Sequence, residues 1–386
     1  MDSKSKSILM MPRVILIALV ALLSSSFVSA QKPAFNFQLS EREIKQAGEL
    51  VLDEIFKEIL ILPLETSDSC FIGKITKVKK TKDYIFILAK NSGENTGTDL
   101  LVFKTNGDFI RKVGRNGKGP GEYTNIQDFC VAEGNGGIFV LDLDKIIEYD
   151  IQGKFVKAYM INAGDHSIHP SRIAWIPGNQ FLIESTGSFQ LGLFDKSGVL
   201  VKNFPSLYNK GIDLPCPFTF FQDHLLINML FVDPVYAIDY KGNIQPYLIV
   251  DYRHLNLDIP SYEEYSKKNF SQMPRDRVIR NFVAENDKEF IIRFSFDWEN
   301  YIGVLTKSGG TTKIYHVGNP NICQTRIPNT FFQSESGELL FWADPSQFKE
   351  PFEKWMTGMR STGNYRLMSD RKVDESSNPV IIYAKY

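Results

Sequence analysis

Residues Leu100–Val113, with the sequence LLVFKTNGDFIRKV, form two apolar runs joined by a turn at Gly107. The first four turn glycines of this kind are spaced by 46, 45 and 44 residues. A repeat of about 40–50 residues made of short strands is typical of one blade of a β-propeller. The pattern therefore predicts an all-β fold. The other four copies are Ile146–Met160 around Gly153, Leu191–Phe204 around Gly198, Val235–Ile249 around Gly242, and Tyr301–Val317 around Gly309 and Gly310.

Five units leave a ring open, and the rest of the chain supplies a sixth. With strands named a to d from the channel outward, Thr325–Phe332 and Glu338–Trp342 fit strands a and b. Pro379–Tyr386 fits strand c, and the early run Glu58–Leu64 supplies strand d. A blade built from both chain ends leaves no long exposed sheet edge. We therefore predict a six-bladed β-propeller with four-stranded blades over residues 57–386; the alternative places 379–386 at the outer edge.

The N-terminal residues 1–30 have the features of an export signal. Lys4, Lys6 and Arg13 precede the apolar run Val14–Leu23, and Val28-Ser29-Ala30 resembles a cleavage site. The run is shorter than the roughly 20 residues needed to span a bilayer, and no second long apolar stretch follows. We expect an exported periplasmic or extracellular protein, cleaved near Ala30, with no membrane span in the mature chain. The alternative is a buried N-terminal helix.

Residues 31–56 are expected to form an N-terminal leader and a short helix. The stretch 31–39 has the composition of a flexible leader. Ser40-Glu41-Arg42-Glu43 fits a capping box, and the apolar residues after it have roughly helical spacing. A short helix packed against the ring is the prediction.

Charge and cysteine content exclude some classes of partner and site. Loss of residues 1–30 removes three basic residues and one acid, which changes the net charge from −1 to −3. This chain lacks the basic excess that nucleic-acid binding requires. The four cysteines are far apart and form no C-x-x-C pair, so structural thiols are expected, with one disulfide as the alternative. They are Cys70, Cys130, Cys216 and Cys323.

The topology of a four-stranded blade places the b–c turns and the connectors between blades on one face, here called the mouth face. Two long insertions fall there, residues 252–277 and 344–378. Each contains a short predicted helix. In the second, an apolar stripe includes Phe352, Trp355 and Met356. This stripe either packs on the ring or helps to bind a ligand, because long loops on a rigid scaffold often carry function.

The connector 114–123 contains four glycines around Arg115, Lys118 and Glu122. It lacks the order of a phosphate-binding loop, and no helix follows it. We expect a compact turn between blades, with Glu122 and Tyr123 held by neighbouring backbone groups. Arg115 and Lys118 remain available to a ligand.

With the preceding strand pair 101–110, this glycine-rich connector resembles a family of exported bacterial six-bladed β-propellers related to NHL-repeat propellers. Leu62–Thr66 and Asn378-Pro379-Val380 are similar to that family too. The resemblance covers residues 55–386. It implies a six-bladed ring and a location in the cell envelope, and it implies no agreed activity. Many members are lipoproteins, whereas this chain lacks the signal cysteine.

Acidic residues recur near the b–c turns, where oxygen ligands from several blades can hold calcium. Asp142, Asp144, Asp297 and Asp344 are the candidate metal ligands; strand-end capping is the alternative role. His166 and His169 offer only two ligands, fewer than a zinc site needs. Aromatic side chains near the mouth can stack on a sugar or contact a peptide. The candidate ligand-binding residues are Arg115, Lys118, Asp142, Asp144, His166, Asp297, Trp298, Asp344 and Trp355.

These patterns favour a binding scaffold of the cell envelope, whose ligand is an envelope protein, a peptide or a glycan. The alternative is a metal-dependent enzyme of the lactonase or lyase type at the channel mouth, with no identifiable catalytic residues. A third possibility is a structural subunit of an assembly. No cofactor is expected apart from a calcium ion.

Overall fold

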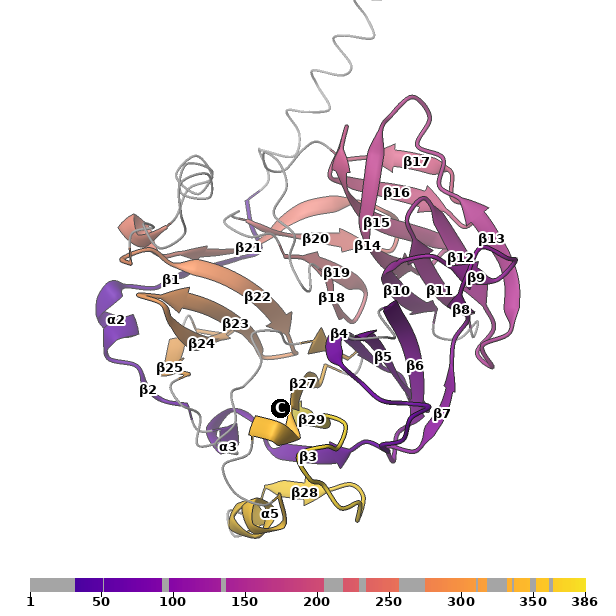
Figure 1. Cartoon of the computed structure of the whole chain (residues 1–386). Helices are drawn as coiled ribbons and strands as arrows, with labels where there is room; N and C mark the ends of the chain where they lie inside the picture. The colour runs from indigo at the N-terminus through magenta and orange to yellow at the C-terminus, as the bar shows by residue number, and fades with distance from the viewer. Residues whose placement is uncertain are drawn as a thin grey trace, which may run out of the picture.

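The computed structural model describes residues 32–50, 52–91, 97–132, 137–204, 218–228, 234–256, 275–309, 312–317, 332–334, 337–347, 352–360 and 364–386. Six sheets of four or five strands form a ring of blades (Figure 1). The predicted six-bladed propeller is thus confirmed. The predictions for residues 1–30, for the helix in 257–274, for residues 325–331 of the strand expected at 325–332, and for Cys216 and Cys323 lie outside the described residues.

The first five blades follow the chain in order, each with strands a to d. Blade 1 contains β4 Lys74–Lys80, β5 Tyr84–Asn91, β6 Gly97–Lys104 and β7 Phe109–Lys112. Blade 2 contains β10 Ile126–Ala132, β11 Gly137–Asp142, β12 Lys145–Tyr149 and β13 Phe155–Met160. Blade 3 contains β14 Ile168–Ile176, β15 Gln180–Gly187, β16 Leu191–Asp195 and β17 Leu200–Asn203. Blade 4 contains β18 Phe218–Phe221, β19 His224–Ile227, β20 Val235–Asp239 and β21 Ile244–Asp251. Blade 5 contains β22 Ile279–Glu285, β23 Glu289–Phe296, β24 Glu299–Thr306 and β25 Thr312–His316.

Blade 6 joins the two ends of the chain, as predicted. Its order is β26 Phe332–Gln333, β27 Leu339–Ala343, β29 Val380–Lys385 and β3 Glu58–Pro63. The last strand pairs antiparallel with the early strand β3, and Lys385 Nζ lies 2.7 Å from Glu58 Oε2. The alternative that placed 379–386 at the outer edge is therefore wrong, because β29 pairs on both sides.

Asn378 strengthens this closure. Its side-chain amide donates to the carbonyl oxygens of Glu65 (2.7 Å) and Cys70 (2.8 Å), and its Oδ1 accepts from Ile72 N at 2.8 Å. Its backbone N–H donates to Thr66 Oγ1. The residue is buried. It thus ties the segment before the last strand to the connector that leads from β3 into blade 1.

The repeated turn glycines are explained by the contact between successive blades. At four of these turn glycines an added Cβ would meet the preceding blade: the end of its outer strand at Gly107 and Gly198, and the side chain of Arg111 or Leu193 at Gly153 or Gly242. A Cβ at Gly107 would lie 2.5 Å from the carbonyl oxygen of Pro63, and one at Gly198 would lie 2.7 Å from that of Met160. Both glycines also have positive φ, +87° and +83°. The repeat therefore marks positions where a side chain is disfavoured by the preceding blade and by conformation.

The core lies between blades rather than at the channel. One cluster packs Phe86 and Val102 of blade 1 on Ile138 and Val140 of blade 2. Equivalent clusters fill the next three interfaces, and a fifth covers blades 5, 6 and 1. Each blade therefore buries both faces, as the dense apolar content of the strands requires.

Residues 35–55 follow the outside of the ring. Strand β1 Phe35–Gln38 pairs parallel with β21, and β2 Gly48–Glu49 pairs parallel with β25. Residues 35–38 were expected within a flexible leader, and they instead form a fifth strand on blade 4. The capping-box helix is present as α2 Glu41–Lys45, and a second short helix, α3 Leu52–Ile55, follows.

The insertion 344–378 also runs to the outer edge. Its helix α5 Phe352–Arg360 buries Phe352 and Met356 against the core, so this part of the apolar stripe packs on the ring. The following strand, β28 Tyr365–Leu367, pairs parallel with β3. The expectation that this insertion covers the channel mouth is therefore wrong for residues 365–367. Two 3-10 turns, Arg253–Leu255 and Pro345–Gln347, are also present.

Two of the four cysteines lie in the described part of the chain. Cys70 and Cys130 are buried free thiols, and burial raises the pKa of the Cys130 thiol. Among the helices described, none is long and apolar enough to cross a membrane.

Candidate functional site: the mouth face

In each of four blades, the entering connector hydrogen-bonds to the b–c side of that blade. Gly73 N donates to Asn91 Oδ1, Ser188 N to Ser167 O, and Asp297 N to Arg275 O. In blade 2 the contact is made by Asp142, described next. The b–c turns and the connectors thus share one face, as the strand topology predicts.

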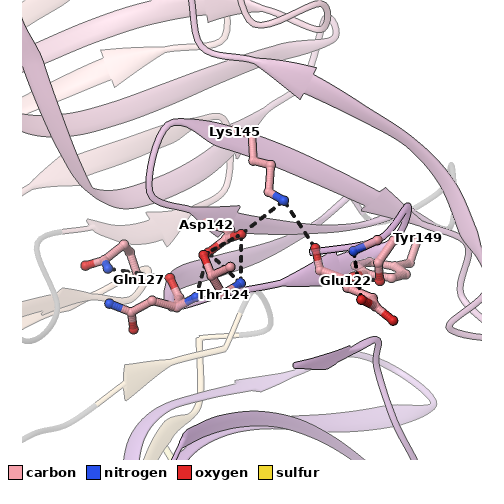
Figure 2. A network of polar contacts seen from close by, with 9 residues as sticks. Glu122, Thr124, Gln127, Asp142, Lys145 and Tyr149 are labelled. Carbon is pink, nitrogen blue, oxygen red and sulfur yellow. Dashed lines mark hydrogen bonds and ion pairs between the residues drawn. The ribbon is translucent and has the colours of Figure 1, made fainter. Parts of the chain in front are cut away.

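Asp142 lies at the centre of a polar network between the first connector and blade 2 (Figure 2). Its carboxylate accepts from Thr124 N, Thr124 Oγ1 and Asn125 N, the last at 2.7 Å. Lys145 Nζ lies 3.3 Å from Asp142 Oδ2 and donates to Glu122 O. Only 1% of the residue is exposed. This carboxylate therefore fixes the connector to the b–c turn, and its oxygens are already engaged by protein donors.

The glycine-rich connector folds around its own carboxylate. Glu122 accepts from Gly119 N (2.8 Å) and from Arg115 Nε (2.6 Å). A Cβ at Gly117 would lie 2.0 Å from Glu122 Oε2, so the glycines leave the space that this carboxylate fills. The hydrogen bond from Gly119 N, aided by Arg115, lowers the pKa of Glu122. The loop thus binds an internal anion at the place where a phosphate-binding loop would bind its ligand.

The expected compact turn is therefore observed. A two-stranded sheet, β8 Arg115–Asn116 and β9 Glu122–Tyr123, closes the loop. Tyr149 OH donates to Gly121 O. Arg115 is exposed but paired with Glu122, whereas Lys118 is exposed at the tip of the loop.

The four acids proposed as metal ligands have separate surroundings. Asp142 is buried in the network above, and Asp344 accepts from Ser346 N and Oγ. Asp144 and Asp297 are exposed. Within the described ranges, no group of three histidine, cysteine, aspartate or glutamate residues is placed to hold a metal ion. The structure therefore does not bring these four acids together as a ligand set.

The remaining predicted residues are distributed as follows. His166 is exposed on the connector into blade 3, with its ring 5.4 Å from that of Phe189. Trp298 is exposed in the b–c turn of blade 5. The side chain of Trp355 lies outside the described residues.

Three exposed large apolar side chains lie on the mouth face: Phe71 (56%), Leu143 (48%) and Trp298 (49%). Phe71 is on the connector into blade 1, and the other two are in b–c turns. Leu143 and Trp298 have φ of 53° and 65°, and Asp297 has 50°. For residues other than glycine this left-handed conformation costs roughly 1–2 kcal/mol each. The chain thus holds two bulky apolar side chains toward solvent on strained two-residue turns, which is more common at functional sites than elsewhere.

Sequence reasoning identified Trp298 but missed Phe71 and Leu143. Phe71 lies in a connector and Leu143 directly follows a buried strand, so each looks like ordinary core sequence. The position of Leu143 in a two-residue turn, where glycine is usual, was the available signal.

Below the mouth, the innermost strands of blades 1–3 are linked by a partly buried ion pair. Lys77 Nζ lies 2.8 Å from Asp128 Oδ1, and Asp128 Oδ2 accepts from Ile173 N at 2.9 Å. Lys77 and Asp128 each follow a β-bulge in strand a. The bulges direct these side chains toward the next blade, so the pair fixes the relative position of three blades.

A second buried cluster lies at the a–b end of blades 4 and 5, away from the mouth face. Glu285 is fully buried and accepts from His224 Nε2 (2.9 Å) and Tyr247 OH (2.8 Å). Lys307 Nζ lies 2.6 Å from its Oε1. Burial opposes protonation of His224, but hydrogen bonds to Glu285 and Asp223 raise its pKa overall. This histidine is thus a paired structural residue.

The fold has counterparts among solved structures. A Bacteroides fragilis protein described as exported is 17% identical, with a TM-score of 0.66 over 91% of this chain and 99% of that one. A Pseudomonas aeruginosa periplasmic gluconolactonase is 8% identical, with a TM-score of 0.41 over 74% and 91%. The Neurospora crassa Pan2 WD40 domain is 8% identical, with a TM-score of 0.39 over 88% and 98%.

At these identities the first likeness shows the propeller fold alone, and the other two support no argument. No functionally curated protein matches the sequence. A family model described as a domain of unknown function, DUF4934, matches residues 34–385. This range includes strand β1 and the closing strands of blade 6, so the match covers the whole ring. The chain belongs to the DUF4934 family of β-propeller proteins.

Proposed function

We propose that this protein is an exported binding scaffold of the cell envelope, and that its mouth face binds a glycan or a peptide. The observation that carries the proposal is the exposure of Phe71, Leu143 and Trp298 on that face, two of them on strained turns. Exposed aromatic side chains with a polar rim are suited to stacking on sugars and to peptide contacts.

The polar groups on this face support binding rather than a reaction. Asp142 and Glu122 are held by protein donors, so they serve the scaffold. Lys118, Asp144 and Asp297 are exposed and can contact polar parts of a ligand. Export rests on the features of residues 1–30.

A glycan array and a peptide library, both screened with the mature chain, test the proposal. Trp298→Asn and Leu143→Asn remove the apolar groups while Asn tolerates the left-handed conformation. Each change should weaken the binding of a captured ligand by about tenfold or more, as for central contacts of an interface. Lys241→Asn, at an exposed position in the c–d turn of blade 4 on the opposite face, is the control. Ligands that bind Trp298→Asn and Leu143→Asn as tightly as the parent would refute the assignment.

The metal-dependent lactonase alternative stays a prediction. A calcium titration of the same protein tests it. A stoichiometric ion that raises the melting temperature, and that is lost in Asp144→Asn or Asp297→Asn, would favour it over the scaffold.

A further inference from the structure

The outer edges of the six blades are not alike. Blades 4, 5 and 6 each carry a short fifth strand, β1, β2 and β28, added parallel to the outermost strand. Among the described residues, the sheets of blades 1, 2 and 3 end at β7, β13 and β17. The outer strands of this ring therefore accept parallel strand addition, and half of them have no added strand in the described chain.

The edge of blade 2 is the most exposed of these. On β13, Val156 is 53% and Met160 is 60% exposed; next to it on blade 3, Val199 is 42% and Val201 is 54% exposed. The two blades touch here, because Asn162 N donates to Gly198 O and Asn162 O accepts from Leu200 N. Tyr159 is the β13 side chain that lies next to Gly198 of blade 3, so the alternation along the strand turns Val156 and Met160 to its other side. Val156 and Met160 alone are called the rim patch. An apolar edge of this kind promotes aggregation unless a partner covers it.

The charged residues on the outer strands beside the rim patch are all basic; one strand further in, Glu148 is in register with Lys157 and is paired with Lys196. Strands β7, β13 and β17 contain Arg111, Lys112, Lys157 and Lys202 and no acidic residue. The ammonium groups of Lys157 and Lys202 lie 5.0 Å from the ring centres of Tyr159 and Phe204. Their charged ends are thus held at the outer surface, where an acidic strand would meet them.

We propose that an extended segment of a partner protein, with alternating acidic and apolar residues, adds to β13 as a fifth parallel strand. Main-chain hydrogen bonds to the open edge give the affinity, as in other cases of strand addition. Its apolar side chains cover the rim patch, and its carboxylates pair with Lys157 and Lys202. Two segments of the chain itself do not match this acidic pattern. Residues 1–30 have a positive net charge, and β1 contains no acidic residue.

The test uses fluorescent synthetic peptides and the mature chain, with binding followed by anisotropy. The probe is an eight-residue peptide of alternating glutamate and valine. Two controls are the lysine–valine peptide and the acidic peptide N-methylated at alternate residues, which keeps its side chains but loses the edge hydrogen bonds. Only the unmodified acidic peptide is expected to bind.

Protein variants locate the site. The double change Val156→Lys and Met160→Lys should weaken the acidic peptide by about tenfold or more, and Lys157→Glu with Lys202→Glu should reverse the preference to the lysine–valine peptide. Lys241→Ser, at an exposed position in the c–d turn of blade 4, lies in neither proposed binding surface and should leave peptide binding unchanged. Three results would each overturn the proposal: the acidic peptide does not bind; it binds the Val156→Lys/Met160→Lys variant as tightly as the parent; or the N-methylated peptide binds as tightly as the unmodified one.

Discussion

The turn glycines of the repeat can be tested by adding a single methyl group. At Gly198 an added Cβ would meet Met160 O at 2.7 Å, and φ is +83°. The left-handed conformation alone costs alanine about 1–2 kcal/mol. Displacing the neighbouring strand adds about 1–3 kcal/mol, as for other overpacked sites. Gly198→Ala should therefore lower the free energy of unfolding by about 3 kcal/mol.

Two control glycines separate these contributions. Gly164 has φ of +64° with nothing within 4 Å of an added Cβ, so Gly164→Ala should cost only the conformational part, about 1 kcal/mol. Gly48 has neither a positive φ nor a neighbour within 4 Å. Gly48→Ala should be neutral, or stabilise by a few tenths of a kcal/mol through the unfolded chain.

The assay is urea unfolding followed by tryptophan fluorescence, with the midpoints compared at a common slope. The predicted order of stability is Gly48→Ala, then Gly164→Ala, then Gly198→Ala. If Gly198→Ala lost no more stability than Gly164→Ala, close approach of the preceding blade would not be the reason for glycine in these turns.

Three further changes have defined outcomes. Asp142→Ala leaves buried donors without an acceptor and should cost about 3 kcal/mol in urea unfolding; an unchanged midpoint would show that the network is dispensable. His224→Gln tests the raised pKa of His224, because Glu285 and Asp223 favour the charged imidazole. The stability that the variant loses relative to the parent should be greatest below about pH 6.5 and should vanish as the pH rises through the raised pKa. A loss of stability that grew with pH would contradict the pairing. Asn228 is fully buried, and no described group bonds its amide, so Asn228→Leu should raise the melting temperature, by an amount equivalent to about 1–3 kcal/mol; a lower melting temperature would show that the amide has a role.

The ring could be predicted from the sequence because successive blades share one structural requirement, which leaves a periodic pattern in the chain. Four blades have a glycine with positive φ in the c–d turn, where an added Cβ would meet the preceding blade, and this requirement leaves a period of about 45 residues in the chain. The sixth blade followed from counting, since the apolar runs at both ends had no other partner. In the structure they pair directly, from Val380↔Pro63 to Lys385↔Glu58.

The added outer strands could not be predicted in the same way. Strands β1, β2 and β28 have four, two and three residues. Strands β2 and β28 are too short to show an apolar pattern. In β1, Phe35 and Phe37 alternate with the exposed Asn36 and Gln38 and pack on the core. This alternation is typical of a strand, but four residues do not identify the sheet edge to which the strand is added.

The role of an acidic residue also depends on its surroundings. Asp142 and Asp144 both stand at a strand end in the sequence, and both were candidate metal ligands. One is buried among Thr124, Asn125 and Lys145, and the other is exposed. Nothing in their immediate sequence distinguishes them, because the donors to Asp142 come from the connector some 18 residues earlier.

The closure of the ring by both chain ends is the claim on which the position of the mouth face and of the outer edges depends. Zero-length carbodiimide cross-linking tests it in the unmodified chain. Lys385 Nζ lies 2.7 Å from Glu58 Oε2, and Lys45 Nζ lies 2.6 Å from Glu41 Oε1 within one helix. The second pair is a control for the reagent, because it forms in any fold that keeps this helix.

Mass spectrometry of the digested monomer should find both the Glu41–Lys45 link and a peptide that joins Glu58 to Lys385. Detection of the local link without the link between residues 58 and 385 would contradict the six-bladed ring closed by β3 and β29.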